Sequence, residues 1–172
     1  MNSTIFFQVQ GQVPVIAQPK TMACWATVGT MLMAWNDRVN YSIEGAMDQL
    51  GSDFRNIFES NSGLSPNRIE DFANATGMTV EYQRCETPES IAQLLENHGP
   101  IIIIDDEDST ISFAIHARII TGVYGNDDGS DTFLNIIDPN QGQVYDESFI
   151  DFSNKYEAMA EANGWNLQMM HY

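Results

Sequence analysis

The spacing of apolar residues changes at Pro100, and this change limits the folds that the chain can adopt. Before Pro100, apolar residues recur with the period of helices. After it, short apolar runs of strand length are separated by turn-rich segments. Because helices come first and strands follow, rather than alternating with them, the sequence predicts an α+β fold with an antiparallel sheet and not a doubly wound α/β fold.

Extended segments are expected up to Pro14, and four helices between there and Pro100. The first of these helices is rich in Met and Trp, so we expect it to be the central, buried helix. The second follows the capping residue Ser42, and the other two each begin at a cap residue that precedes a proline. The predicted helical ranges are 24–38, 42–51, 65–77 and 87–99.

The second part of the chain is expected to supply most of the sheet. Strands are predicted over residues 101–104, 112–124 and 132–138, a helix over 153–162 and a last strand over 165–170. A chain of 172 residues fits one domain. We therefore expect a single domain over residues 1–172, with a helical half over about 18–99 and a sheet half over about 100–172.

The charge of the chain excludes two classes of partner. It has 24 acidic and 7 basic residues, a formal net charge of −17, and such a surface repels nucleic-acid phosphates and anionic membranes. No apolar run approaches the roughly 20 residues of a membrane span, and the N-terminal residues lack the basic and apolar regions of a Sec signal peptide. We expect no nucleic-acid partner and no membrane partner.

The two cysteines are too few for a disulfide framework. Cys24 stands where a polar turn enters the first predicted helix, and backbone N–H groups at a helix start favour a thiolate. A lone cysteine in an apolar helix is also a common core residue, so its position alone leaves both interpretations open. Cys85 has no set of metal ligands around it, and we expect a structural or free thiol there.

Gln18 is a candidate partner of Cys24. It lies six residues earlier, across a loop that contains a proline. Its amide could return over the helix start and, with the backbone N–H of Cys24, donate to an oxyanion formed during acyl transfer. A solvated loop glutamine is the alternative.

Three histidines could act as a base. His171 is expected to fray, and His98 falls in the last turn of a predicted helix, where a protonated histidine complements the helix dipole. His116 lies inside a predicted strand, on the same face as Arg118 and the small Ala114, which leaves room for a substrate. A histidine satisfied within the sheet is the alternative.

Hairpin register predicts the residue that would orient His116. If the loop after the strand is centred near Asp127, His116 pairs with Asp138, and directly opposed residues have Cβ atoms about 5 Å apart. Asn135 and Asn140 are alternatives, although Asn135 points to the opposite face. An acid without a catalytic role at a strand end is also possible.

Together these residues predict a site for nucleophilic catalysis. Cys24 would be the nucleophile, His116 the base and Asp138 the group that holds the imidazole, with Gln18 as an oxyanion donor. The four residue types in this order carry more weight together than any one of them alone.

The segment from Gln18 to Ala26, with Ala23-Cys24-Trp25 at its centre, resembles the active-site segment of papain-like cysteine proteases. The ranges 98–102, 116–123 and 136–139 are similar to the compact bacterial branch of that family, which includes staphopains, plant-pathogen effector proteases and peptidases that trim double-glycine leaders. The resemblance covers about residues 18–143. It implies a helical half and a sheet half with the catalytic cleft between them.

Three departures separate the chain from the plant and lysosomal enzymes. Only the last three positions of Thr21-Met22-Ala23-Cys24-Trp25 match their motif, and partner cysteines for their disulfides are missing. Asp138 stands where papain has Asn, whereas the bacterial branch commonly has Asp. These departures argue against a lysosomal enzyme but leave the chemistry intact.

Two acidic segments, 105–108 and 126–128, could be interpreted as calcium-binding loops. Neither has the spaced Asp ligands, the Gly and the distal Glu of an EF-hand, so solvated loops are expected. Zinc would need more Cys and His than the chain has. We expect no metal and no cofactor.

The resemblance implies a thiol hydrolase that cleaves peptide bonds of protein or peptide substrates. The same triad could instead serve an amidase, a deamidase or a transglutaminase, and a degenerate papain-like module that only binds a partner is the other class of function. About 17 residues precede Gln18, too few for an inhibitory pro-segment. We therefore expect a bacterial effector or toxin domain, restrained by an inhibitor (immunity) protein. It would be delivered without a Sec signal to the cytoplasm of a target cell, or otherwise be cytoplasmic.

Overall fold

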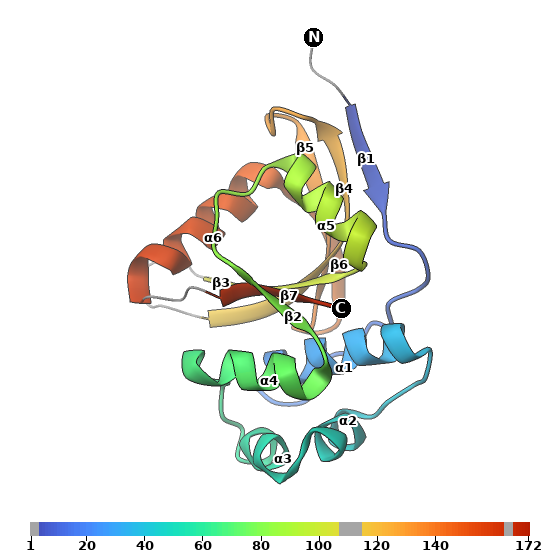
Figure 1. Ribbon diagram of the computed structural model, residues 1–172, viewed down its shortest axis with the longest axis vertical. Coiled ribbons are helices and arrows are strands. Elements are labelled where there is room, and N and C mark those ends of the chain that lie inside the picture. Colours follow the sequence, from blue (N-terminus) through green and yellow to red (C-terminus); the bar gives the residue numbers. More distant parts are fainter. Residues whose placement is uncertain (1–3, 107–114, 164–166) are drawn as a thin grey trace.

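The computed structural model describes residues 4–106, 115–163 and 167–172, and within them a sheet lies between two groups of helices. Figure 1 shows helices α1 to α4 on one side of the central strands and α5 and α6 on the other. Each face of the sheet covers its own cluster of buried apolar side chains. The architecture is the expected α+β fold.

The predicted helices are present, and the last of them, predicted over 153–162, begins four residues earlier, at Phe149. Two further differences concern the helices before Pro100. The segment 65–77 is divided into a short 3-10 turn and a helix, and a further helix, α3, follows α2 directly at Gly51. The packing of Phe54 and Phe58, which lie one turn apart, buries one side of α3. The helices are α1 (Cys24–Asp37), α2 (Ile43–Leu50), α3 (Ser52–Glu59), the 3-10 turn η1 (Pro66–Arg68), α4 (Ile69–Thr76), α5 (Pro88–His98) and α6 (Phe149–Asn163).

All strand pairs in the sheet are antiparallel, in the order β2-β7-β3-β4-β5-β6, with β1 paired to the second half of β4. Strands β2 and β6 were not expected from the sequence, and residues 112–114 and 165–166 of two predicted strands lie outside the described residues. The strands are β1 (Thr4–Gln8), β2 (Thr79–Tyr82), β3 (Ile101–Asp106), β4 (Ile115–Asn126), β5 (Thr132–Asp138), β6 (Gln143–Ser148) and β7 (Leu167–His171).

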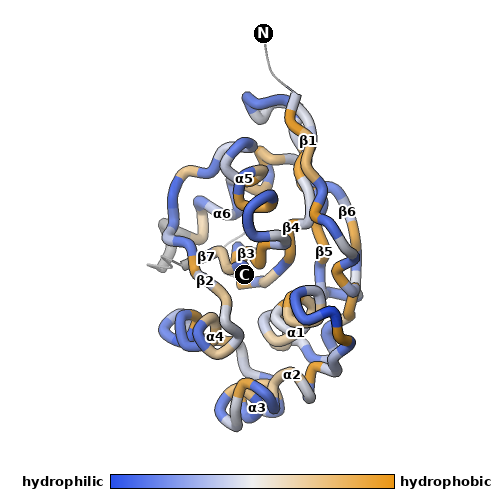
Figure 2. The backbone as a smooth tube through the Cα atoms, turned by 45° about the vertical axis from the view of Figure 1, so that its right-hand side comes forward, coloured by the Kyte–Doolittle hydropathy of each residue, from blue (hydrophilic) through white to orange (hydrophobic). Residues whose placement is uncertain are grey.

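Helix α1 is the central helix of the molecule, as its composition predicts. Every residue from Trp25 to Ala34 is buried, and the helix packs against α2 and against strands β3 and β4. Helices α2 and α3 lie on the side of α1 that faces away from the sheet, and α4 lies beside α1, against β2 and β7 (Figures 1 and 2).

The spatial layers do not divide at residue 99. Helix α5 packs on β1, β3 and β4, in the cluster that α6 also covers, and β2 is a strand of the sheet. Only α1 to α4 form the helical layer that lies against the other face. Figure 2 shows the hydrophobic segments along the central strands and the hydrophilic ones in the outer connections.

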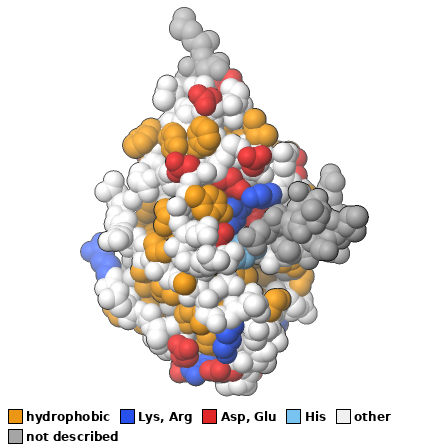
Figure 3. Space-filling model, turned by 180° about the vertical axis from the view of Figure 1, so that it is seen from behind, with side chains coloured by type: hydrophobic (Ala, Val, Ile, Leu, Met, Phe, Trp, Pro, Cys, Tyr) orange, Lys and Arg blue, Asp and Glu red, His pale blue; other side chains and the backbone are white. Residues whose placement is uncertain are grey.

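Apolar side chains also reach the surface at several separate places. On the face seen in Figure 3, hydrophobic groups are scattered over the upper, middle and lower parts of the molecule, between charged ones. None of the helices within the described ranges has both the length and the apolar character needed to cross a membrane.

Replacing Gly29 with alanine should destabilise the fold. A Cβ atom at this position of α1 would lie 2.5 Å from Cζ of Phe72 on α4, and overpacking of a core costs about 1–3 kcal/mol. We expect Gly29→Ala to lower the free energy of unfolding in urea by about that amount. In a Phe72→Leu background, Gly29→Ala should lower the free energy of unfolding by less than it does in the wild type, because the ring that meets the new Cβ atom is gone. An unchanged free energy for Gly29→Ala alone would contradict the close approach of α1 and α4.

Candidate active site

A cleft of about 580 Å³ opens between the helical layer and the sheet. Cys24 and Gln18 line it from the helical side, and His116 lines it from β4. Asp138 lies behind His116 at the end of β5. The structure therefore brings together the four residues that the sequence singled out. The rest of the lining is mostly apolar: Met22, Trp25, Val28, Leu64, Ile69, Ile102, Ile104, Ile115, Ala117 and Met170.

Cys24 is the first residue of α1 and is partly exposed. The first N–H groups of a helix have no partner within the helix. Here the cap residue is Ala23, which makes no side-chain cap, and the first turn contains no acidic residue. The positive end of the helix dipole is thus left to act on a negative charge at Cys24 or on a bound substrate.

The turn before α1 is held by the end of α3. Lys20 Nζ donates to the carbonyl oxygens of Phe58 and Glu59, each at 3.2 Å, which places a cation at a helix C-terminus. Asn61 Oδ1 accepts from the backbone N–H of Met22 at 3.0 Å. These contacts fix the approach of the chain to Cys24.

Gln18 lies in the cleft, but its amide N–H groups are already used. Nε2 donates to the carbonyl oxygens of Lys20 at 3.0 Å and Thr21 at 3.1 Å, and Oε1 is buried without a hydrogen-bond partner within the described residues. Its backbone N–H donates to Pro139 O at 2.7 Å, which ties this turn to the end of β5. Gln18 could donate to a substrate only after one of the two hydrogen bonds made by its Nε2 atom breaks.

His116 and Asp138 form a buried pair. The imidazole Nε2 donates to Asp138 Oδ1 at 2.7 Å, and the two side chains are 7% and 6% exposed. Asp138 Oδ1 also accepts from the backbone N–H of Asn140 at 2.8 Å. The carboxylate therefore fixes which way the imidazole ring faces.

The predicted register for this pair was wrong, although the pair itself forms. Asp138 was expected directly opposite His116, but Ile119 pairs with Ile137 and Ile120 with Ile136. Extending that register places Asp138 two residues further along β4 than His116, so the contact is diagonal, which such side chains can span.

Two local features explain this error. The turn is centred close to Gly129, which has φ of +78°, and Asp128 accepts hydrogen bonds from Ser130 within it. A bulge between Ile120 and Gly122 then shifts the register once more. The turn displaces the pairing by three residues from the predicted register, and the bulge moves it back by one. The net displacement of two residues is even, so His116 and Asp138 still share one face of the sheet.

The environment favours a charged His116. Burial lowers the pKa of the imidazole, but hydrogen bonds to Asp138 and Cys24 and the Coulombic interactions with both raise it, to about 10. Burial raises the pKa of Asp138, but the hydrogen bond and charge of His116, together with the hydrogen bonds from Asn140 and Tyr145, outweigh it, so that the pKa is lowered. The two shifts agree on an imidazolium–carboxylate pair.

Two residues behind this pair were not singled out from the sequence. Tyr145 of β6 donates to Asp138 Oδ2 at 3.2 Å and accepts from Nη1 of the buried Arg118 at 2.8 Å. Because β6 was not predicted, Tyr145 could not be placed. Arg118 was assigned to the correct face but given no partner.

The other two histidines lie together outside the cleft lining. His171, expected to fray, is 1% exposed in β7, with its ring stacked on that of His98 at 4.0 Å between centroids. His171 Nε2 also lies 2.9 Å from Glu81 Oε1. Packing of β7 between β2 and β3 is the reason that this end of the chain is ordered.

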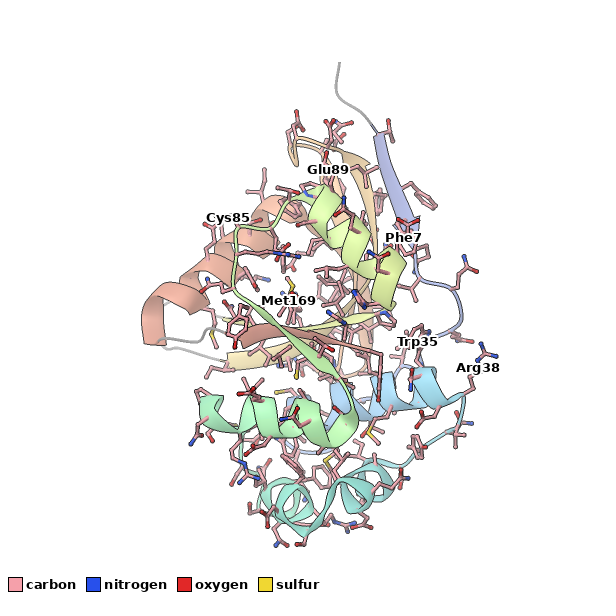
Figure 4. All side chains as sticks on the ribbon, viewed as in Figure 1. Phe7, Trp35, Arg38, Cys85, Glu89 and Met169 are labelled. Atoms are coloured by element: carbon pink, nitrogen blue, oxygen red, sulfur yellow. The ribbon has the colours of Figure 1, made fainter. Side chains whose placement is uncertain are left out.

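The remaining candidates are placed as follows. Asn135 donates to Asp146 at 2.7 Å, away from Asp138. Cys85 is exposed, and Figure 4 shows it on the connection between β2 and α5, well away from α1.

Asp105 corrects one expectation. It was assigned to a solvated acidic loop, but it lies fully buried in β3 and is paired with Arg118. Residues 107–108 of that segment lie outside the described residues. Within the described part of the chain, no group of three or more Cys, His, Asp or Glu side chains is placed to hold a metal ion.

The His116–Asp138 pair should make stability depend on pH. The pKa of His116 is raised from 6.5 to about 10 on folding, so its contribution is complete below pH 6.5 and is lost as the pH rises toward 10. Asp138, with a lowered pKa, contributes above about pH 3.8 and loses its contribution below that. The free energy of unfolding of the wild type should thus exceed that of His116→Gln by about 1–3 kcal/mol near pH 5–6.

Urea unfolding of both proteins from pH 5 to pH 10 measures this difference. It should shrink steadily above pH 6.5. A difference that stays constant over this range would show that His116 is not held in its charged form.

Comparison with known protein families supports the resemblance. A family model described as papain-like cysteine protease AvrRpt2 matches residues 7–157, a range that includes all four candidate residues and most of the sheet. No curated protein matches the chain. The match covers most of the chain and agrees with the observed α+β architecture. The chain therefore belongs to the papain-like cysteine protease AvrRpt2 family, a family of bacterial effector proteases.

Proposed function

We propose that the protein cleaves peptide bonds of protein substrates with Cys24 as nucleophile, His116 as acid and base and Asp138 as the group that orients His116. The observation that carries this proposal is the convergence of two elements on one cleft. Helix α1 presents Cys24 at its positive end, and β4 presents His116, which is bonded to Asp138 at 2.7 Å. This is the arrangement that thiol acyl transfer requires.

The first half of the reaction forms a thioester. The Cys24 thiolate attacks the carbonyl carbon of the scissile peptide, and the carbonyl oxygen takes up the negative charge. The C–N bond then breaks as His116 gives its proton to the leaving amine. Asp138 stabilises the imidazolium before this transfer and keeps the ring in position.

The second half restores the enzyme. His116, now neutral, takes a proton from water, and the resulting hydroxide attacks the thioester carbon. The C–S bond breaks, the acid product leaves, and the thiolate–imidazolium pair is regenerated.

The oxyanion would be met by the start of α1 and by Gln18. The Cys24 backbone N–H belongs to the group of helix N–H donors that have no partner in the helix. Gln18 would contribute by turning one Nε2 hydrogen from the Thr21 carbonyl, its longer contact at 3.1 Å, to the substrate oxygen. This donor acts when charge develops and is otherwise part of the turn.

The cleft favours substrates with a bulky apolar side chain near the scissile bond. The cleft that contains Cys24 is lined by apolar side chains from both layers: Val28, Leu64 and Ile69 from the helical side, and Ile102, Ile104 and Met170 from the sheet. Met22 and Ile115, which are 47% and 40% exposed, extend this apolar surface to the rim. Burying such a side chain would contribute about 1.5–3 kcal/mol to binding.

We further propose that this protease acts as an effector or toxin domain in the cytoplasm of a target cell, restrained by an inhibitor (immunity) protein. Family membership supports the effector role. The net charge of −17 suggests that such an inhibitor carries a basic surface.

Cys24→Ala should abolish proteolysis and leave the fold intact, because alanine suits a helix start. Identification of new protein N-termini in cells that express wild type or Cys24→Ala measures this directly. Wild type should produce new N-termini that follow sequences with bulky apolar residues, and Cys24→Ala should produce none.

Cys85→Ala is the matched control, because it removes the other, exposed thiol. It should cleave like wild type. Equal cleavage by Cys24→Ala and wild type would overturn the assignment of Cys24 as the nucleophile. Chemical modification of cellular proteins without new N-termini would favour an amidase or transglutaminase.

Gln18→Ala should separate the two roles of this residue. Loss of one oxyanion donor lowers kcat by about 10- to 1000-fold, whereas alkylation of Cys24 by iodoacetamide forms no oxyanion and should hardly change. His116→Ala should lose both turnover and alkylation. If Gln18→Ala lost both equally, its contacts with Lys20 and Thr21 would be its only role.

A further inference from the structure

Asp138 is connected to a buried cation on its far side. Its Oδ2 atom accepts from the Tyr145 hydroxyl at 3.2 Å, and the same hydroxyl accepts from Arg118 Nη1 at 2.8 Å. Strands β4, β5 and β6 supply one residue each to this row. Tyr145 pairs with Ile136, two residues before Asp138, so it reaches the carboxylate diagonally across the sheet.

The direction of the hydrogen bonds in this row is determined by chemistry. A guanidinium only donates, so the Tyr145 oxygen must accept from Arg118. The single hydroxyl hydrogen of Tyr145 is then free to donate only in another direction, and Asp138 Oδ2 lies there. Both oxygens of Asp138 thus accept from protein groups, Oδ1 from His116 and Asn140 and Oδ2 from Tyr145.

Arg118 is itself held in place and shielded from water. It is 1% exposed, it is paired with Asp105 of β3, and its Nη1 lies 3.0 Å from Glu147 Oε2 of β6. Lys155 of α6 pairs with the other oxygen of Glu147. The guanidinium therefore cannot swing away from Tyr145 without separating the buried Asp105 carboxylate from its cation, which is costly in a buried site.

We propose that Tyr145 is a positioning residue for catalysis, one that holds the Asp138 carboxylate in the orientation that grips the His116 imidazole. This inference rests on the proposed roles of Cys24, His116 and Asp138. Tyr145 does not line the cleft, so it acts through Asp138 and not on the substrate.

The charged groups around Tyr145 agree with this role. Burial raises the pKa of its hydroxyl to about 12, with Arg118 opposing this and Asp138 and Glu147 adding to it. The hydroxyl therefore keeps its hydrogen over the whole range in which the enzyme would work. Its bond is also one of the contacts that lower the pKa of Asp138.

The test is Tyr145→Phe, which removes one oxygen from a half-buried ring. Without it, Asp138 should hold the protonated His116 less firmly, and the thiolate of Cys24 should form at higher pH. We expect kcat to fall about 3- to 10-fold with KM unchanged, the scale of one ordinary hydrogen bond. The iodoacetamide alkylation profile of Cys24, measured with Cys85 replaced by Ser, should move about half to one pH unit upward.

Tyr124→Phe is the matched control. Tyr124 also donates to an aspartate, Asp146, at 2.9 Å, but this bond is exposed and belongs to a different pair of side chains. Tyr124→Phe should leave kcat and the alkylation profile at their wild-type values. A merely structural role for Tyr145 would lower thermal stability and leave the alkylation midpoint where it is, which would overturn the inference.

A double variant tests whether Tyr145 acts through Asp138. In an Asp138→Ala background, Tyr145→Phe should cause no further change in the alkylation profile, and a further shift of the same size would overturn the inference. This readout needs no protein substrate. If Cys24→Ala is inactive but the alkylation profile of Tyr145→Phe is not shifted, only the positioning role of Tyr145 is refuted. If Cys24→Ala retains full proteolysis, the proposed function itself is refuted.

Discussion

The burial of α1 between the sheet and helices α2 to α4 is the constraint on which the rest of the site depends. Because residues from Trp25 to Ala34 are buried on all sides, the helix can neither rotate nor slide without opening a core. Its first residue is therefore held at the edge of the sheet, where the cleft opens. The unpartnered N–H groups of the helix start come with it, so one packing interaction provides both the place of the thiol and its electrostatic environment.

The sheet supplies a second, polar constraint. On one face of β3 to β6 lies a connected set of polar side chains, all buried except the half-buried Tyr145: Asp105, Arg118, Asp138, Tyr145 and Glu147. Buried charges are tolerated only when they are paired. Here the pairing also joins His116 to the interior, so the polar face positions the imidazole while the opposite face packs on α1.

The two constraints meet in a small number of contacts. The Gln18 backbone N–H bonds to Pro139 O, and the turn that contains it is held by the end of α3. The segment that leads into Cys24 is thus tied to the strand end that carries Asp138. Without this link the width of a cleft between two layers would vary. The link holds the two sides of the candidate site at a constant distance from each other.

Local sequence signals determined much of this molecule. The period of the apolar residues, the cap residues and the glycines predicted the four early helices, the order of helices before strands and the placement of Cys24 at a helix start, since these depend on interactions within a few residues. The shared face of His116 and Asp138 was also predictable, because alternation along a strand survives a shift of two residues. The pairing register, the strands β2 and β6, the burial of His171 and Asp105 and the contact of Tyr145 with Asp138 were decided only by the tertiary structure. Each of these depends on a bulge, a turn centre or a partner strand distant in sequence, and the short segments involved have no pattern strong enough to specify such partners by themselves.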